Sequence, residues 1–375
     1  YACFFDHRSA AINRLQTILI VACALCLVPI GSFVAAGETT KQIQPLDVFE
    51  LEYAADPRIA PDGEWIVYAR TSMDIMKDSK RSTLWRIGFD GRDHRPLTSS
   101  QDSQGSPRFS PDGKRLAYMS VADGSAQLYV RWLDTGQEAK LTQLPRSPGG
   151  LTWSPDGKHI AFSMFVPDSP EPFVKMPDKP KGAEWAEPAK VISKLKYRSD
   201  GSGYLEDGYT HLFIVSAEGG TPHQVTSGDF NHNASPVWTP DGQSLIFSAN
   251  RHDDWEFDIL NSEIYEVALG SGAIKALTDR FGPDESPVLS PDGKQIAYVG
   301  FDDKRQGYET RKIYVMNRDG SGSKLLSGSL DRGAESLVWD ANGNGLYFQY
   351  SDQGDTKIAY IGLDGQLETL TGSVG

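Results

Sequence analysis

Four residues near the middle of the chain, Arg198, Tyr204, Glu206 and Asp207, are of types that bind charged ligands. Two adjacent carboxylates attract a positively charged group, and an aromatic ring nearby can pack against it. These residues therefore predict a substrate-binding site suited to the free amino terminus of a peptide. A solvated loop at an ordinary strand edge is the alternative interpretation, and the sequence alone leaves both open.

Motifs for covalent, metal or nucleotide chemistry are missing from the sequence. No Gly-x-Ser-x-Gly is present, although an α/β-hydrolase nucleophile requires that motif on a strand–turn–helix. The seven histidines form no His-Glu-x-x-His or His-x-His pair, and no phosphate-binding Gly-rich loop follows a strand. His223 and His232 flank one turn, but no third metal ligand stands out beside them. We therefore expect no catalytic residue, no metal and no cofactor in these 375 residues.

The scaffold that positions any site comes from one sequence unit that occurs six times. Five copies carry Pro-Asp-Gly between an apolar stretch and an alternating strand, and the last copy carries Ala-Asn-Gly. The glycines that mark the copies are Gly63, Gly113, Gly157, Gly242, Gly293 and Gly343. Their spacings of 50, 44, 85, 51 and 50 residues are typical of propellers, and the long spacing indicates one unit with an insertion.

Each unit has the pattern of four antiparallel strands. Pro presets φ in the turn after the first strand, Asp bonds the backbone ahead, and Gly accepts a positive φ. A second strand, a polar loop, a third strand such as residues 126–133, and a short fourth strand follow. Four such strands form one propeller blade, whose apolar faces are buried by neighbouring blades. The sequence thus predicts an all-β fold, a β-propeller with six visible blades; a seventh blade in a full-length protein stays open.

Specific positions follow from this fold class. We expect the propeller at residues 56–375, after a linker or short helix at 37–55. The tryptophans expected to pack between blades are Trp65, Trp153, Trp238 and Trp339. The aspartates of the Pro-Asp-Gly turns are expected to stabilise those turns, with a calcium site as the alternative.

Loops alternate between the two faces of a propeller. The Pro-Asp-Gly turns lie on one face, the turn face. Loops between second and third strands, and connections between blades, lie on the other, the loop face. The long segments all belong to the loop face, including an insertion at about residues 165–208 of blade three with an expected short helix at 182–197. Because function usually resides on such loops, we expect a ligand or partner domain to meet this face.

The N-terminal residues have the pattern of an export signal. Arg8 and Arg14 precede or flank an apolar run at residues 15–36, which ends in small residues before Gly37. We expect residues 1–36 to be a signal peptide and the protein to be exported, most simply to a periplasm. An uncleaved membrane anchor is the alternative, because the run is long enough to span a bilayer.

Charge and cysteine content narrow the function classes. The chain has 37 Lys and Arg against 50 Asp and Glu, a net charge of −13, so a nucleic-acid partner is not expected. All three cysteines precede Gly37, so the remaining residues contain neither a disulfide nor a cysteine metal site.

The repeats and the blade-three insertion resemble a known family. Stretches at 128–145, 161–177, 183–215, 250–258 and 313–322 are similar to the N-terminal propeller of prolyl oligopeptidase-family serine peptidases. The acylaminoacyl-peptidase and dipeptidyl-peptidase-like bacterial branch is the most similar, and the resemblance covers about residues 41–375. It implies a propeller that caps a C-terminal α/β-hydrolase domain with a Ser, Asp and His triad, and that restricts access to short peptides.

The hydrolase half is absent from this sequence, so no catalytic residue carries over and we expect this chain alone to be inactive. The resemblance further implies that acidic propeller residues bind the free amine of the substrate, and loop position makes Glu206 and Asp207 the candidates. We therefore expect the substrate-gating part of a longer exported peptidase, with peptides and a hydrolase domain of the same polypeptide as partners.

Two other function classes stay open. A stand-alone TolB-like periplasmic propeller would bind proteins without catalysing a reaction. A propeller enzyme such as a polysaccharide lyase would need a histidine or metal cluster at the channel mouth, and the sequence offers none.

Overall fold

The computed structural model describes residues 42–122, 124–168, 177–186, 191–232 and 235–372. The predicted signal peptide at 1–36 lies outside these residues. The chain divides into two compact units, residues 1–45 and residues 46–375, and the second contains the blades. In the described part of the chain, no helix is both long enough and apolar enough to cross a membrane.

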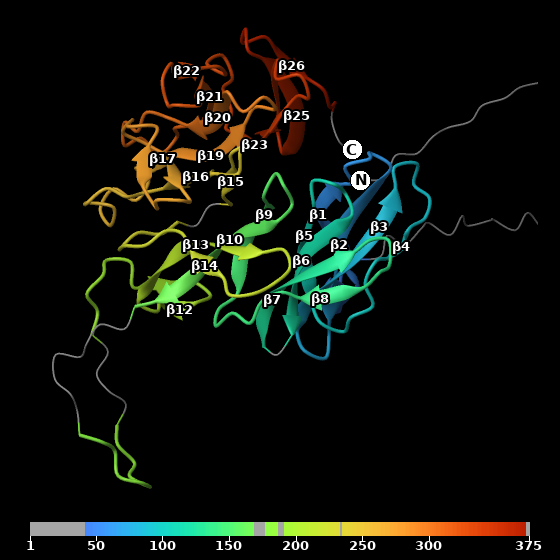
Figure 1. The fold of residues 1–375 in the computed structure, drawn as a ribbon, viewed down its shortest axis with the longest axis vertical. Coiled ribbons are helices and arrows are strands. Elements are labelled where there is room, and N and C mark those ends of the chain that lie inside the picture. The colour runs from blue at the N-terminus through green and yellow to red at the C-terminus, as the bar shows by residue number, and fades with distance from the viewer. Residues whose placement is uncertain (1–41, 123, 169–176, 187–190, 233–234, 373–375) are drawn as a thin grey trace, which may run out of the picture. The chain divides into compact units, whose positions relative to one another are not determined.

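The second unit is a propeller of six four-stranded antiparallel sheets, as predicted (Figure 1). The strands of the first three blades are β1 (Glu52–Ile59), β2 (Trp65–Asp74), β3 (Ser79–Gly88), β4 (Arg95–Pro96), β5 (Gln104–Phe109), β6 (Arg115–Ala122), β7 (Ser125–Trp132), β8 (Glu138–Lys140), β9 (Pro148–Trp153), β10 (His159–Pro167), β13 (Gly208–Ser216) and β14 (His223–Gln224). The strands of the last three blades are β15 (Val237–Trp238), β16 (Ser244–Ala249), β17 (Glu263–Ala268), β18 (Ile274–Ala276), β19 (Asp284–Leu289), β20 (Gln295–Gly300), β21 (Lys312–Asn317), β22 (Lys324–Leu325), β23 (Ala334–Trp339), β24 (Gly345–Asp352), β25 (Asp355–Gly362) and β26 (Leu367–Thr369).

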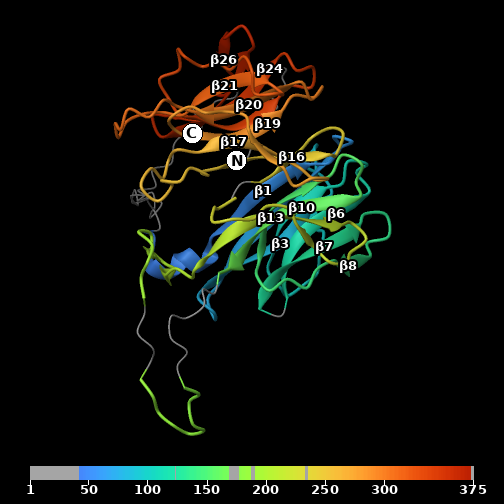
Figure 2. The same ribbon diagram turned by 60° about the vertical axis from the view of Figure 1, so that its left-hand side comes forward.

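Each sheet uses strands in chain order, and the first strands of successive blades contact one another. Figure 2 shows β19, β20 and β21 of the fifth blade lying side by side. A 3-10 helix, η1 (Pro45–Glu50), precedes the first blade, and β1 then begins inside the range predicted as linker. The blades therefore hold their second-to-third loops and their connections on the loop face.

The insertion in blade three contains a small two-stranded hairpin, β11 (Arg198–Ser199) and β12 (Gly203–Tyr204). The helix predicted at 182–197 is wrong for the described residues of that stretch, 182–186 and 191–197, which are not helical. The sequence has a proline at position 188, in the middle of the stretch, and an interior proline removes a helical hydrogen bond and clashes with the preceding turn.

Apolar clusters fill the spaces between successive blades. Val67 and Leu84 of the first blade, for example, pack in one cluster with Leu116 and Tyr118 of the second. Each of the second to fifth blades contributes one face to the cluster before it and one to the cluster after it, so successive blades stabilise one another.

The predicted packing of the tryptophans is confirmed. Trp153, Trp238 and Trp339 are buried, and Trp65 is half-buried against Phe109. The indole N–H groups of the three buried tryptophans donate to carbonyls in the first strand of a preceding blade, at Arg108 (2.9 Å), Thr152 (3.3 Å) and Val288 (3.1 Å) respectively. These bonds repeat across blades and fix the first strands against one another.

The turn aspartates also have the predicted structural role. In the second blade, Asp112 accepts a hydrogen bond from the Ser110 hydroxyl (2.6 Å) and one from the Lys114 amide (3.1 Å). The same pattern recurs at Asp156 and Asp292. These bonds lower the pKa of each of the three carboxylates, because they stabilise the charged form.

The sixth blade exposes side chains that the repeat buries elsewhere. Ala297 and Tyr347 are equivalent positions, each four residues after the glycine that marks its repeat. Ala297 of the fifth blade is fully buried, whereas Tyr347 of the sixth is 42% exposed. Ile313 of the fifth blade is fully buried, and its counterpart Ile358 is 39% exposed. Two apolar side chains that lie between blades in the fifth blade are therefore on the surface in the sixth.

Candidate functional site

Neighbouring cavities open on the loop face of the third and fourth blades. The insertion cavity, about 320 Å³, is lined by the blade-three insertion. The acidic cavity, about 380 Å³, is lined in part by Asp229, Asp253 and Glu256, and the polar cavity, about 410 Å³, in part by Ser262. Lys194 lines both the insertion and acidic cavities, and Trp255 lines both the acidic and polar cavities, so the three lie next to one another.

The structure brings three of the four predicted site residues together. Tyr204, Glu206 and Asp207 all line the insertion cavity. Arg198 lies opposite Tyr204 in the β11–β12 hairpin but is not part of the lining. All four are exposed, so the predicted cluster is on the surface of the loop face.

Both predicted carboxylates already face a cation. The Glu206 carboxylate accepts two hydrogen bonds from Nη2 of Arg146, at 2.6 and 2.8 Å. Asp207 lies 3.7 Å from Nζ of Lys194, which also sits 4.2 Å from the Tyr209 ring centroid. An amine at this cavity would have to compete with Arg146 and Lys194, so amine binding by Glu206 and Asp207 stays a prediction.

Arg146 is a residue that the sequence analysis missed. It lies in the connection between β8 and β9, far from Glu206 in the chain. No local motif marks it, because only the packing of the blade-three insertion against the preceding connection brings the two side chains together.

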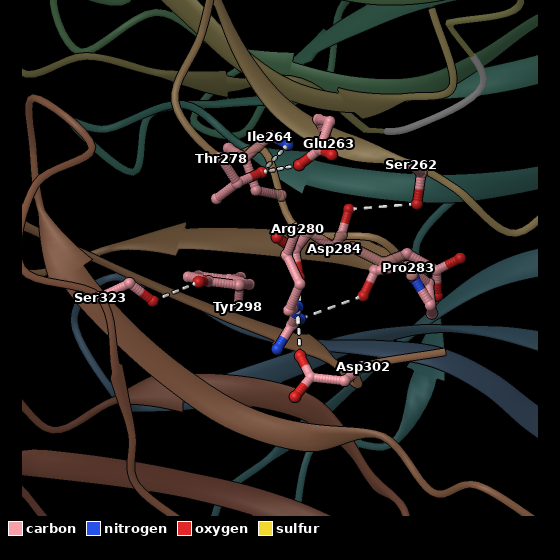
Figure 3. Close-up of polar contacts among 12 residues, drawn as sticks. Ser262, Glu263, Ile264, Thr278, Arg280, Pro283, Asp284, Tyr298, Asp302 and Ser323 are labelled. Carbon is pink, nitrogen blue, oxygen red and sulfur yellow. Dashed lines mark hydrogen bonds and ion pairs between the residues drawn. The ribbon is translucent and has the colours of Figure 1, made fainter. Parts of the chain in front are cut away.

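A second polar cluster is buried between the fourth and fifth blades (Figure 3). Glu263 begins β17 and is only 2% exposed; one of its oxygens, Oε2, accepts a hydrogen bond from the Thr278 hydroxyl. The other oxygen, Oε1, lies 3.5 Å from Nε2 of His252. Within the described part of the chain, neither of these two atoms has a hydrogen-bond partner.

The lower part of this cluster contains an ion pair. The Asp284 carboxylate, fully buried at the start of β19, contacts the Arg280 guanidinium. Nε of Arg280 lies 3.5 Å from the Asp302 carboxylate, and its guanidinium stacks 4.0 Å from the centroid of the Tyr314 ring. Ser262 donates from its hydroxyl to the Asp284 carbonyl (3.3 Å), which joins this pair to the wall of the polar cavity (Figure 3).

Burial makes both carboxylates easier to protonate. It raises the pKa of Glu263 to about 7, and the hydrogen bond from Thr278 only partly offsets this. Burial likewise raises the pKa of Asp284 to about 6, against the opposing effect of Arg280. Groups with such pKa values exchange protons near neutral pH, which is uncommon for carboxylates and typical of functional sites and buried ion-pair networks alike.

A comparison within the molecule shows what is unusual about Glu263. Gln127 occupies the equivalent position in the second blade. Gln127 and Glu263 each lie fifteen residues before a threonine. Its Oε1 accepts from the Thr142 hydroxyl (3.0 Å) and the Leu144 amide (2.8 Å), and its Nε2 donates to the Leu144 carbonyl (3.0 Å). The neutral glutamine is fully bonded, whereas the acid in blade four retains an unpartnered oxygen.

The sequence analysis also missed Glu263 and Asp284. The available indication was a glutamate immediately before an apolar strand, at a position where the second blade has glutamine. Among the described residues, no group of three or more His, Cys, Asp or Glu side chains is arranged to hold a metal ion.

Comparison with known proteins assigns the chain to a family. The family model described as PD40, the TolB β-propeller domain, matches residues 72–179 and 197–371. The chain belongs to this family. The match begins at residue 72, near the end of β2 in the first blade, continues into the sixth blade, and omits residues 180–196, which lie within the insertion.

Two curated relatives of this PD40 propeller are named as peptidases. Dipeptidyl-peptidase 5 of Porphyromonas gingivalis is 25% identical over 90% of this chain and 50% of its own length. Uncharacterized peptidase YuxL of Bacillus subtilis is 29% identical over 87% of this chain and 51% of its own length. The solved structure of Pyrococcus horikoshii acylaminoacyl peptidase has a TM-score of 0.65 at 20% identity, covering 87% of this chain and 47% of that one, which shows a shared propeller fold. The chain thus spans about half the length of the curated relatives it matches.

Proposed function

We propose that this PD40 propeller is the substrate-gating part of a serine peptidase that hydrolyses short peptides and is exported. The observation that carries the proposal is the pattern of coverage. The chain matches two proteins named as peptidases along nearly all of its own length, but along only half of theirs. A division between a gating propeller and a separate hydrolase domain accounts for this pattern and for the lack of a nucleophile motif in the chain.

The geometry of the propeller suits a gating role. A large shell of blades admits short, flexible chains and excludes folded proteins by size, while a triad elsewhere performs the chemistry. The loop face supplies polar cavities and charged side chains at the third and fourth blades, where a peptide end can be held. We infer that this face points toward the hydrolase domain.

The test is to read the coding sequence beyond Gly375 and to assay its product. The proposal expects an open frame with Gly-x-Ser-x-Gly followed by Asp and His, and a product that cleaves dipeptidyl or N-acyl chromogenic peptides but not a folded protein. Replacing the serine of that motif by alanine should abolish cleavage, which distinguishes the encoded activity from a contaminating peptidase.

A stand-alone binding propeller is the second candidate. It is supported by the description of the matching family as the TolB β-propeller domain. It expects a stop codon close to Gly375 and no peptide hydrolysis by the product. In that case the loop face would bind a protein partner, and the peptidase proposal would be wrong for this chain.

A further inference from the structure

Arg251 is a positively charged residue on the loop face. It follows β16 and is half-buried. Its guanidinium carbon lies 4.8 Å from the ring centroid of Phe230, which lines the acidic cavity, and 5.8 Å from that of Tyr265. Arg311 of the same face, in contrast, lies 2.8 Å from the Glu285 carboxylate. In the part of the chain that the structure describes, no carboxylate forms an ion pair with Arg251.

A buried histidine holds this arginine in place. Nη1 of Arg251 donates to Nε2 of His232, at 2.6 Å. Nδ1 of His232 lies 3.2 Å from the Thr210 carbonyl, an acceptor only, so the ring proton is on Nδ1 and Nε2 is free to accept. Burial, with the charge of Arg251, lowers the pKa of His232 to about 3, so the imidazole is neutral at physiological pH.

The remaining N–H groups of Arg251 are available to a ligand. Within the described residues, the hydrogen bond that Arg251 makes to the protein is the one to His232. Its other guanidinium nitrogens are not among the buried atoms that lack a partner, which indicates that they are open to solvent. Arg251 itself lines neither cavity, but the preceding residue, Asn250, lines the polar cavity, and the Phe230 ring that contacts the guanidinium lines the acidic one. A fixed guanidinium with unused donors matches the geometry of a carboxylate, which it can bind through two parallel bonds.

We propose that Arg251 binds the terminal carboxylate of a short peptide, with His232 as its positioning residue. The peptide would be a cleavage product or the far end of a short substrate. Its body would pack on Trp255 and Tyr209, whose rings meet edge to face at 6.3 Å beside the acidic cavity. This deepens the proposed function, on which it rests for the identity of the ligand as a peptide.

The surroundings favour a peptide carboxylate over a phosphate. Asp229, Asp253 and Glu256 line the adjacent cavity, and a phosphate with nearly two negative charges would be repelled by them. A short peptide carries one carboxylate together with an ammonium group, and the same acidic side chains attract that ammonium.

The experiment compares two ligands and four proteins by isothermal titration calorimetry on the 375-residue chain. The ligands are the dipeptide alanyl-phenylalanine and its C-terminal amide, which differ only in the carboxylate. We expect the amide to bind the unmodified protein about 10- to 100-fold more weakly, the range for losing a charge-assisted hydrogen bond. Arg251→Gln should remove this preference, Arg251→Lys should retain part of it, and the matched control Arg311→Gln should leave it unchanged.

Four results would overturn the inference. Equal binding of the dipeptide and its amide, or no binding of either, would exclude a carboxylate site, as would a preference that survives in Arg251→Gln. Displacement of the dipeptide by inorganic phosphate far more effectively than by acetate would show a general anion site instead. A purely structural role predicts a lower melting temperature for Arg251→Gln with the ligand preference intact.

The two proposals fail separately. If the dipeptide binds as expected but the product of the complete coding sequence cleaves no peptide, the peptidase assignment is wrong and the Arg251 site stands. If the product cleaves peptides but the calorimetric preference is absent, only the Arg251 site is wrong.

Discussion

The turn face and the loop face of this propeller are built from the same six repeats but differ in how their polar groups are bonded. On the turn face, Asp112, Asp156 and Asp292 make near-identical pairs of hydrogen bonds. On the loop face, Glu263 and Asp284 are buried acids with unpartnered oxygens, and Arg251 has no carboxylate partner in the described residues.

This difference separates what the repeat needs from what varies between blades. A turn that recurs with the same hydrogen bonds contributes to folding wherever it occurs, and its copies contribute similar amounts to stability. A buried acid or an unpaired arginine costs stability and does not recur in every described blade, so it has a reason other than the fold. Substitutions on the two faces should therefore behave differently, and the predictions below are ordered from the largest expected effect to the smallest.

Arg280→Ala should cause the largest loss of stability. It leaves the buried Asp284 carboxylate without its cation, and breaking a buried pair in this way costs about 3–5 kcal/mol. The loss should be larger at pH 8 than at pH 5, because a protonated Asp284 needs no cation. Urea unfolding measures it, with Arg311→Ala as a control for an exposed pair worth about 0–1 kcal/mol. Equal losses in the two variants would contradict the account.

Glu263→Gln should change how stability depends on pH. The folded protein binds the Glu263 proton more tightly than the unfolded chain, because the pKa is about 7 when folded against an ordinary value of 4.5. This group therefore favours folding at low pH, and its contribution falls as pH rises from about 4.5 to about 7.

Glutamine carries no charge, so the variant should be more stable than the unmodified protein at pH 8, by roughly 1–3 kcal/mol. The advantage should shrink as pH falls toward 5. Thermal unfolding across that pH range measures the difference, and Glu285→Gln is the matched control for a less buried glutamate. A difference that stays constant with pH would show that Glu263 has an ordinary pKa.

Asp112→Ala should cost about 1 kcal/mol, the usual value of a turn-capping side chain. The same substitution at Asp156 and at Asp292 should cost a similar amount, because the bonds are the same. None of the three should alter dipeptide binding. Losses that differ by more than the cost of one hydrogen bond would mean that the turn face is less uniform than its geometry indicates.

Glu206→Gln should have the smallest effect on stability, within about 0.5 kcal/mol, because its pair with Arg146 is exposed. If Glu206 binds the substrate amine, the variant should bind alanyl-phenylalanine more weakly but leave N-acetylated peptides unaffected. Glu218→Gln, which alters an exposed pair with Arg115 on the turn face, is the control. An identical response of both peptides would remove Glu206 from the candidate site.

The blade order, the turns and the packing of the tryptophans could be predicted from the sequence because they are local and periodic. A Pro-Asp-Gly turn carries its own conformation, and a strand that alternates apolar residues carries its own buried face. The helix predicted at 182–197 is wrong in the described residues, because the sequence of this otherwise helix-favouring stretch is interrupted by a proline at position 188.

The candidate site could be predicted only in part. Glu206, Asp207 and Tyr204 share one cavity because they are close in the chain. The pairing of Glu206 with Arg146, and of Arg251 with His232, depends on loops from different strands meeting across the face. The raised pKa values of Glu263 and Asp284 depend on burial, which the presence of an acidic residue in the sequence does not reveal.

Hydrogen exchange of the 375-residue chain, with and without saturating alanyl-phenylalanine, tests most directly whether the loop face of the third and fourth blades is the peptide-binding surface. The account predicts slower exchange in loop-face segments 191–209, 229–232 and 250–262, with the Pro-Asp-Gly turns unchanged. Slower exchange confined to the turns, or no change anywhere at saturation, would contradict it.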